Sequence, residues 1–502
     1  MFCYKNGARL RHNTNAAYAP FMSSHTTTSS LFATSVSASG SAAPALDLAT
    51  APSLTGSITL PARSDLPGHI GKYRVLRQLG EGATSDVFLA VDDFLHVEVA
   101  IKRVRSWAVP ENPQGQISGR FFAAEAALAG RLNHPNVVRI LDAVGDTESP
   151  YLVMEYVPGV TLKSFCRSDR LLPLDQIVEL GFKCAMALGY VFRQGLIHRD
   201  VKPANLLAVL DAQGHITDVK VSDFGSALNL NADSTQVHRV GSLAYMPPEQ
   251  IEGGDVDCRA DMYSLGAVLY HLVAGRPPFD APSQMALMHQ IYHQPPQSLV
   301  GMRSGVTAEL DAVIMKALAK HPQDRYTDWD SFGRALSDLV ARQLVPLARL
   351  HEVKDSERFN MARGLDFFAD FGDVELWEVV HRARWRRFPV GYALFKRGQE
   401  GNTFHIITQG EVEVIREDRH VATLGAGTSV GEMAYLAPNP DLRRHSTDVR
   451  VTEVCTTISF SPESLALLSP QTQHRFDRAF IQVLVRRLHA AHEALAHPRR
   501  IM

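Results

Sequence analysis

The sequence predicts an α+β protein with two ordered domains, and three patterns support that prediction. Apolar and polar side chains alternate over 73–79 and 87–90, on either side of a turn that contains glycine, which is typical of a β-hairpin. Apolar residues recur at helical spacing over 174–196, where Gly195 marks the end of the helix. From residue 389 onward, short strands alternate with glycine turns, which predicts a small antiparallel barrel or jelly roll.

Composition limits the classes of protein to which the chain can belong. Its 502 residues, 45% of them hydrophobic, are enough for roughly two to four domains with real cores. The net charge of −2 gives no support for a nucleic-acid or anionic-membrane partner. Five scattered cysteines without CxxC spacing argue against disulfides and zinc, and favour a reducing, cytoplasmic location. No apolar run is long enough to span a membrane.

Residues 1–68 are rich in Ser, Thr, Ala and Pro and follow neither helical nor strand periodicity. Such a segment cannot bury enough apolar surface to offset its chain entropy, so a disordered tail is predicted. A targeting peptide is the alternative, because basic residues occur near the start and no acidic residue precedes Asp47.

Residues 198–205 read His-Arg-Asp-Val-Lys-Pro-Ala-Asn and contain the first chemical signature. Asp200, Lys202 and Asn205 are spaced for a loop whose side chains converge on one point. An acid that accepts a proton, a cation for phosphate charge and an amide that holds a metal are the groups that phosphoryl transfer requires. A second acid, Asp223, begins an Asp-Phe-Gly turn 18 residues after Asn205. Most isolated His-Arg-Asp triplets are surface ion pairs, so the interpretation depends on the other parts being present.

Two further features precede this loop. Gly80 and Gly82 lie in the turn between the first two strands, where glycine lets backbone N–H groups approach phosphate oxygens. Lys102 ends a short apolar strand, and Glu125 lies on the apolar face of a predicted helix over 121–132. Because a buried glutamate is costly unless it is paired, we expect an ion pair between Lys102 and Glu125. A solvent-exposed lysine and a hairpin without a phosphate role are the alternatives.

In this order, the motifs resemble those of bacterial and eukaryotic-like Ser/Thr protein kinases, over residues 70–342. The resemblance implies a bilobal kinase fold with ATP as cofactor and Mg²⁺, or Mn²⁺, as the metal. Asp200 would take the proton of the substrate hydroxyl, Lys202 would stabilise the phosphoryl group, and Asn205 and Asp223 would hold the metal. Glu125 would orient Lys102 on the ATP phosphates. The implied ATP-binding residues are Leu79, Gly80, Gly82, Val87, Ala100, Lys102, Glu155, Val157 and Leu207.

The resemblance also implies an activation segment over 226–249. Candidate phosphorylation sites in it are Ser234, Thr235 and Ser242. Ser242 stands where the family usually has a threonine that contacts Asp200, so Ser234 and Thr235 are favoured. A phosphate at either residue would pair with Arg199, which precedes Asp200.

The resemblance also implies two structural contacts, and the sequence differs from the family pattern at two positions. Glu249, which closes the activation segment, is expected to pair with Arg325, and Asp261 is expected to brace the backbone of the catalytic loop. Ser85 replaces the third glycine of the loop, and His271 stands where arginine-directed kinases carry a glutamate. His271 therefore predicts no strong demand for arginine upstream of the target residue.

The second domain is predicted over 373–490, after a helical linker over 343–372. The runs at 404–414 and 427–436 resemble cyclic-nucleotide-binding domains, which implies a β-roll with flanking helices and cAMP or cGMP as effector. A helix that begins at Gly431 would favour an anion, Glu432 would accept a ribose hydroxyl, and Arg444 would cap the cyclic phosphate. The implied binding residues are Gly431, Glu432, Met433, Ala434, Arg444, His445 and Ser446.

This second signature also departs from its family. No proline precedes Arg444, His445 replaces a small or hydroxyl residue, and Asp448 stands at a position expected to be apolar and inward-facing. A degenerate pocket that serves regulation or dimerisation is therefore the alternative to nucleotide binding. The threonine that favours cGMP is missing after Arg444, which favours cAMP. One helix with a basic end is predicted after the barrel.

The sequence thus predicts a cytoplasmic Ser/Thr protein kinase that transfers the γ-phosphoryl group of ATP to protein hydroxyls and is regulated in cis by its C-terminal domain. Ligand binding would release an inhibitory contact or promote a homodimer. Two alternatives stay open: an active kinase whose barrel binds no nucleotide, and a pseudokinase scaffold with a nucleotide sensor. The presence of all four groups, Lys102, Asp200, Asn205 and Asp223, argues against the pseudokinase.

Overall fold

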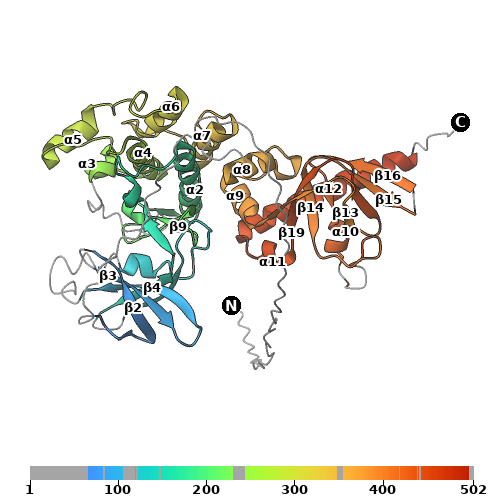
Figure 1. Ribbon diagram of the computed structural model, residues 1–502, viewed down its shortest axis with the longest axis horizontal. Coiled ribbons are helices and arrows are strands. Elements are labelled where there is room, and N and C mark those ends of the chain that lie inside the picture. The colour runs from blue at the N-terminus through green and yellow to red at the C-terminus, as the bar shows by residue number, and fades with distance from the viewer. Residues whose placement is uncertain are drawn as a thin grey trace, which may run out of the picture. The chain divides into compact units, whose positions relative to one another are not determined.

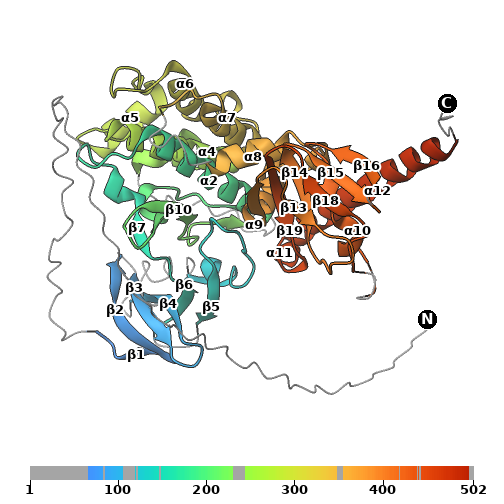
Figure 2. The same cartoon turned by 45° about the vertical axis from the view of Figure 1, so that its right-hand side comes forward.

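The computed structural model describes residues 66–496, except 83–84, 106–118, 120–121, 146–148, 230–242, 347–353, 418, 438 and 440–442. These residues belong to one compact unit that extends from residue 63 to the end of the chain (Figure 1; Figure 2). Nearly all of the predicted tail, residues 1–68, lies outside the described part.

The first region begins with a six-stranded antiparallel sheet in the order β1-β2-β3-β4-β6-β5. Its strands are β1 (His69–Ile70), β2 (Tyr73–Glu81), β3 (Ser85–Asp92), β4 (Val97–Val104), β5 (Ile140–Val144) and β6 (Tyr151–Glu155). The predicted hairpin is confirmed as β2 and β3, whose register pairs Gly80 with Val87. Alternate apolar side chains, Phe88 and Ala90 on β3 and Val99 and Ile101 on β4, are buried together.

A helical lobe follows the sheet. Its helices are α2 (Leu174–Arg193), α3 (Pro248–Glu252), α4 (Cys258–Ala274), α5 (Gln284–His293), α6 (Ala308–Ala317) and α7 (Trp329–Ala341). Helix α2 is buried on nearly every side because α4, α7 and strand β10 (Ile216–Val221) all pack against it. Gly181 allows the approach of α4, since a Cβ there would lie 2.7 Å from the Leu269 side chain. The helix predicted over 174–196 is confirmed for 174–193, and Gly195 follows its end with φ of +79°.

Short elements connect the sheet to the helices. They are β7 (Gly159–Thr161), β8 (Leu196–Ile197), β9 (Leu206–Leu210), β10, β11 (Leu228–Asn229) and the 3₁₀ turns η2 (Leu162–Phe165), η3 (Pro203–Asn205), η4 (Leu243–Tyr245) and η5 (Pro322–Asp324). Strand β9 pairs with β7 and β10, and β8 pairs with β11. Residues 198–205 therefore lie between two strands that fix the ends of their loop.

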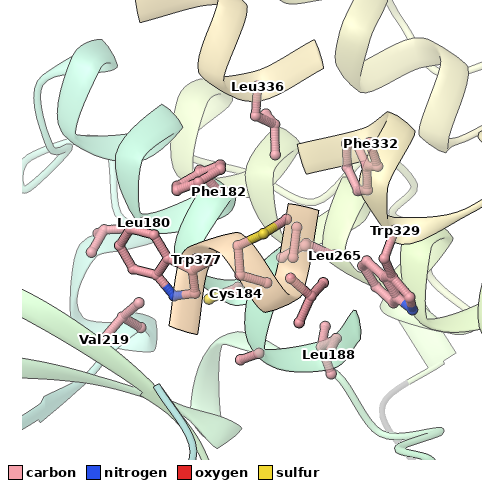
Figure 3. Close-up of a cluster of buried hydrophobic side chains, with 14 of the residues drawn as sticks. Leu180, Phe182, Cys184, Leu188, Val219, Leu265, Trp329, Phe332, Leu336 and Trp377 are labelled. Atoms are coloured by element: carbon pink, nitrogen blue, oxygen red, sulfur yellow. The ribbon is translucent and has the colours of Figure 1, made fainter. Parts of the chain in front are cut away.

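A helical connector comes next, with α8 (Asp355–Arg363), the 3₁₀ turn η6 (Asp366–Phe368) and α9 (Asp373–Arg382). Helices α8 and α9 pack against α2 and α7. Trp377 of α9 is fully buried, and its ring meets the Phe182 ring edge-on at 5.2 Å (Figure 3). Its Nε1 donates to Oδ1 of Asn136 at 3.1 Å. On α8, Oγ of Ser356 donates to the buried carboxylate of Glu179 at 2.6 Å. The connector is therefore part of the core of the helical lobe.

The second region is a β-roll of two four-stranded sheets, in the orders β12-β19-β14-β17 and β13-β18-β15-β16. Its strands are β12 (Arg384–Phe388), β13 (Ala393–Phe395), β14 (Phe404–Gln409), β15 (Val412–Arg416), β16 (Arg419–Leu424), β17 (Ser429–Val430), β18 (Asp448–Val451) and β19 (Cys455–Phe460). Apolar residues of both sheets, including Phe395, Ile407 and Val449, form one core. The predicted antiparallel barrel or jelly roll is confirmed.

Three helices accompany the β-roll: α10 (Glu432–Tyr435), α11 (Pro462–Ala466) and α12 (Pro470–Ala496). Helix α12 packs on the roll through aromatic rings, since the centroid of Phe404 lies 6.0 Å from that of Phe476 and 4.7 Å from that of Phe480. Although α12 is long, neither it nor any other helix among the described residues is apolar enough over a sufficient length to cross a membrane.

His405 provides a pH-dependent test of the β-roll. It is buried on β14, where Nδ1 forms a hydrogen bond with Oγ1 of Thr457 at 2.9 Å. Burial lowers the pKa of His405 from 6.5 to about 4. The folded state therefore binds fewer protons than the unfolded state, so the contribution of His405 to stability is complete above pH 6.5 and is lost as the pH falls towards 4.

The free energy of unfolding is expected to fall between pH 7 and pH 5, and His405→Gln is expected to make that fall about 2 kcal/mol smaller. Urea unfolding of both proteins at the two pH values measures the effect. An equal loss in the wild type and the variant would contradict it.

Candidate active site

The loop between β8 and β9 brings Asp200, Lys202 and Asn205 together. Oδ2 of Asp200 accepts hydrogen bonds from Nζ of Lys202 at 2.7 Å and from Nδ2 of Asn205 at 3.0 Å. Nδ2 of Asn205 also donates to the backbone O of Asp200 at 2.9 Å, and both residues are buried. A carboxylate that can accept a proton is thus oriented by a cation and an amide.

Asp261 of α4 braces the backbone of this loop, as expected. Its Oδ2 accepts from the N–H of His198 and its Oδ1 accepts from the N–H of Arg199, both at 2.8 Å. These bonds hold Arg199 at φ of +62°, a conformation that is costly for a residue with a Cβ. Burial raises the pKa of Asp261, and neighbouring His198 together with the two backbone hydrogen bonds opposes that rise.

Lys102 on β4 links two carboxylates. Its Nζ lies 2.8 Å from Oε2 of Glu125 and 2.7 Å from Oδ1 of Asp223. Glu125 belongs to the helical turns at 122–126, and Asp223 follows β10, so the two ion pairs connect three segments that are far apart in sequence. The expected pair of Lys102 with Glu125 is present. Lys102 is therefore not a solvent-exposed lysine at a strand edge.

The charges of this trio are tightly coupled. Burial raises the pKa of Glu125, and the charge of Lys102 opposes that rise. Burial alone would lower the pKa of Lys102, but Glu125 and Asp223 raise it well above its usual value. Burial would likewise raise the pKa of Asp223, but Lys102 outweighs it and lowers that pKa below its usual range. Asp223 is thus ionised at neutral pH, and 42% of its side chain stays exposed for contact with a cation.

Strands from both sides of the catalytic loop carry the residues predicted to surround a nucleotide: Leu79 and Gly80 on β2, Val87 on β3, Ala100 on β4 and Leu207 on β9. The N–H of Gly82 donates to the backbone O of Ser85 at 2.8 Å, which closes the turn, while the tip at 83–84 lies outside the described residues. The carboxylate of Glu155 pairs with Lys220 at 3.0 Å, so its side chain is engaged elsewhere. Val157 lies just beyond β6.

The donor set fits a metal that arrives together with phosphates. Among the described residues, no group of three His, Cys, Asp or Glu side chains could hold a metal ion by itself. Asn205 and Asp223 offer an amide and a carboxylate oxygen. Mg²⁺ is commonly bound through one or two such groups together with waters and substrate phosphates.

Glu249 and Arg325 form the expected ion pair. Nη1 and Nη2 of Arg325 donate to the two carboxylate oxygens of Glu249 at 2.6 and 2.8 Å. The Arg325 side chain is fully buried, and its Nε and Nη2 also donate to the backbone O of Ala319 and Lys320. This pairing ties the end of the activation segment to the loop before α7.

Arg199 has spare hydrogen-bonding capacity. Its Nε donates to the backbone O of Ser226 at 2.9 Å, whereas its buried Nη1 has no hydrogen-bond partner within the described residues. Burial lowers the pKa of Arg199, and Asp261 opposes that shift. The candidate phosphorylation sites, Ser234, Thr235 and Ser242, fall in 230–242, outside the described residues.

A second candidate site is a cavity of about 160 Å³ in the β-roll. Its lining includes six of the seven residues predicted for the effector: Gly431, Glu432, Met433, Ala434, His445 and Ser446. Gly431 has φ of +87°, and a Cβ there would lie 2.7 Å from the Phe395 ring. A glycine is therefore required where this chain turns into α10.

The structure does not bring Arg444 to this cavity. The Arg444 side chain is exposed, and its Nη1 donates to the backbone O of Gly398 at 2.9 Å. His445 takes the inward position instead: it is buried, its ring stacks on Phe395 at 4.0 Å, and burial lowers its pKa. Asp448, expected at an inward-facing apolar position, does not interrupt the core. Its Oδ1 accepts a hydrogen bond from the N–H of Arg397 at 2.8 Å.

Among the described residues, Arg487 of α12 is the arginine that lines the cavity, although the motifs at 404–414 and 427–436 do not include it. Its Nη1 forms an ion pair with Oε1 of Glu432, and its Nη2 donates to the backbone O of Ser429 at 2.6 Å. Glu432 is buried, and its Oε2 has no hydrogen-bond partner in the described part of the chain. The basic end predicted for the last helix was the sequence signal, because a buried glutamate requires such a partner.

Comparison with known families agrees with this geometry. Residues 73–340, more than half of the chain, match the protein kinase domain. The chain belongs to the protein kinase family. Residues 385–469 match the cyclic nucleotide-binding domain, so the kinase domain is followed by a domain of that second family.

Curated bacterial proteins resemble the kinase domain. Identity is 39% over 270 residues with serine/threonine-protein kinase PknB of Mycobacterium leprae, covering 52% of this chain and 42% of the relative. It is 36% over 314 residues with PknB of Mycolicibacterium smegmatis, covering 59% and 47%. A probable serine/threonine-protein kinase of Clostridium acetobutylicum is 33% identical over 273 residues, covering 53% and 40%. The chain thus spans less than half the length of these relatives.

The Glu249–Arg325 pair of the kinase domain gives a stability prediction. Arg325→Ala is expected to lower the free energy of unfolding by about 3–5 kcal/mol, because it leaves a largely buried carboxylate without a partner. Removing both charges, as Arg325→Met with Glu249→Gln, is expected to cost less than the single change. Urea unfolding of the purified chain measures both. A double variant that is less stable than Arg325→Ala would contradict this account.

Proposed function

We propose that this chain is an ATP-dependent Ser/Thr protein kinase whose C-terminal cyclic nucleotide-binding domain regulates it in cis. The observation that carries the catalytic part is the position of Lys102 between Glu125 and Asp223. It joins the strand, helix and loop that must be aligned for phosphoryl transfer. A pseudokinase that had lost catalysis would have no need to keep this arrangement beside an intact catalytic loop.

The chemistry follows from the positions of these groups. Asn205 and Asp223 would hold Mg²⁺, which neutralises charge on the ATP phosphates when it is bound. Lys102 would position those phosphates. The oxygen of the substrate hydroxyl would form a bond to the γ-phosphorus as the bond to ADP breaks, and Asp200 would take the hydroxyl proton. Lys202, 2.7 Å from Asp200, would stabilise charge on the transferred group.

His271 supports the expected indifference to arginine in the substrate. Its Nδ1 forms a hydrogen bond with the hydroxyl of Tyr245 at 2.7 Å, and burial lowers its pKa. The side chain is therefore neutral at physiological pH. No carboxylate stands at this position to attract a cationic substrate residue.

Replacing the proposed base tests the enzyme assignment. Asp200→Asn is expected to lower the rate of phosphate transfer to a generic Ser/Thr substrate by about 10²–10⁴, because the acceptor of the hydroxyl proton is lost. Radiolabelled transfer from ATP at saturating Mg²⁺ measures the rate, and thermal unfolding checks that the variant is folded. If the wild-type protein transfers phosphate no faster than Asp200→Asn, the result would favour the pseudokinase.

The regulatory part rests on contacts of helix α9 with α12. The carboxylate of Glu378 on α9 accepts from the N–H and Oγ of Ser469 at 2.5 and 2.8 Å, and from Oγ1 of Thr472 at 2.7 Å. Glu378 is buried, so these bonds are strong constraints on the start of α12. A movement of α12 would therefore also displace α9.

The adjacent residue of α9 contacts the kinase domain. Nε1 of Trp377 donates to Oδ1 of Asn136, and Nδ2 of Asn136 donates to the backbone O of Val219 at 2.9 Å. Val219 lies on β10, the strand that leads to Asp223. A conformational change at the effector cavity would thus shift Asp223, the proposed metal ligand, through movements of α12, α9 and β10. A ligand can shift this equilibrium only by its differential affinity for the two states.

In the cavity beside Glu432, Arg487 competes with an effector for the Glu432 carboxylate. Arg487 already binds Oε1 of the Glu432 carboxylate, which leaves only the buried Oε2 to receive a ribose hydroxyl. The position of Arg444 outside the lining favours the second candidate function, an active kinase whose β-roll binds no nucleotide.

Arg487→Ala separates these two functions. If cAMP or cGMP is the effector, the variant is expected to bind it about tenfold or more tightly than the wild type, because a charged contact no longer has to be displaced. Titration calorimetry with each nucleotide measures the affinity. Arg486→Ala is the matched control, since Arg486 lies next in the chain but pairs with Asp366 at 3.7 Å. No binding of either nucleotide by any of the three proteins would favour the non-binding β-roll.

A further inference from the structure

A larger cavity, of about 630 Å³, lies where the connector enters the β-roll. Its lining comes from the end of α9, strands β12, β14 and β19, and helix α11. None of its lining residues also lines the cavity beside Glu432. It is therefore a separate feature of the second domain, and nothing proposed above for ATP or cyclic nucleotide uses it.

The most unusual property of this cavity is its arginines. Arg382 is the last residue of α9, and Arg384 and Arg386 follow on β12, where residues two apart face the same side of the sheet. Within the described residues, no hydrogen bond or ion pair from a protein group engages any of the three guanidinium groups. Nε of Arg382 is buried without a partner, which is costly for a charged donor. The chain thus provides no direct partner for three neighbouring guanidinium groups, of which those of Arg384 and Arg386 are exposed to solvent.

Two other arginines of the same domain have a carboxylate partner. Arg475 pairs with Glu375 at 2.7 Å, and Arg487 pairs with Glu432. At the larger cavity the single carboxylate in the lining is Glu463, and the two histidines there, His381 and His405, have pKa values that burial lowers. At neutral pH the lining therefore carries three guanidinium charges against one carboxylate.

The remaining lining supplies a hydroxyl group and an apolar wall. Thr403 offers a hydroxyl, while Phe460 and Leu467 offer apolar surface. The hydroxyls of Ser459 and Ser464 already donate to the backbone O of Arg384 and of Ser461. Guanidinium groups and a hydroxyl in one concave site suit the oxygen atoms of a phosphate, because the planar fork of arginine donates two parallel N–H bonds. The volume is within the range of cavities that hold small organic ligands.

We propose that this cavity is a binding site for a small phosphate-bearing anion, held by Arg382, Arg384 and Arg386. The proposal is independent of the kinase activity and of cyclic-nucleotide binding. The anion carries at least two negative charges, since it must match the excess of cations over Glu463. Because Arg382 ends the helix that carries Trp377, occupancy of the cavity also stabilises the connector in the position described.

Pyrophosphate is a suitable probe, in Mg²⁺-free buffer at fixed ionic strength. Titration calorimetry on the full chain is expected to detect binding that Arg384→Gln with Arg386→Gln weakens about tenfold or more, since each charged hydrogen bond contributes a factor of that order. Arg387→Gln is the matched control: Arg387 is exposed on the same strand and does not line the cavity. Its affinity is expected to equal that of the wild type.

Two further variants keep the result interpretable. Arg384→Lys with Arg386→Lys retains the charge but loses the forked geometry, so an intermediate affinity is expected even if the glutamine variant folds poorly. Lys102→Met removes the cation of the ATP site, and unchanged pyrophosphate affinity is expected. Equal weakening by Arg387→Gln, or loss of binding in Lys102→Met alone, would overturn the proposal. Wild-type protein that binds pyrophosphate no more tightly than sulfate would overturn it as well.

Discussion

The contact on which the catalytic arrangement depends is the one that Lys102 makes with two carboxylates. Glu125 is buried, so it could not stay charged at its position without a cation nearby, and the partly exposed Asp223 shares that cation. Because the three groups come from β4, the helical turns at 122–126 and the turn after β10, their mutual attraction fixes how the sheet lobe meets the turn that carries Asp223. Any motion that separated Glu125 from Lys102 would leave a buried charge unpaired and would therefore be resisted.

The connector extends this constraint to the second domain. Its helix α9 inserts Trp377 into the core beside Phe182, and the next residue, Glu378, holds the start of α12. A linker that only joined two domains would leave such side chains in solvent. Here the packing makes α9 a shared element, so a change in the position of α12 costs energy in both domains. The basic cavity lies at the end of this same helix.

Local spacing was a good guide wherever a motif is contained in one short loop. Asp200, Lys202 and Asn205 converge because only a few residues separate them and strands fix both ends of the loop. The same reasoning failed at Arg444. Neighbouring residues in an extended segment face opposite sides, so an offset of one residue exchanges the inward and outward positions. That offset places His445 in the cavity and Arg444 outside it.

The sequence by itself determined the family, the convergence of Asp200, Lys202 and Asn205 and the partners Lys102–Glu125 and Glu249–Arg325, because motif order and the cost of an unpaired buried charge are both readable from residue types. Tertiary structure alone decided where the arginine side chains at the two cavities of the second domain go. Arg487 reaches Glu432 across 55 positions, and the arginines from 382 to 386 gather around one cavity. Such side chains have many partners within reach, and only the packing of helices on the β-roll selects among them.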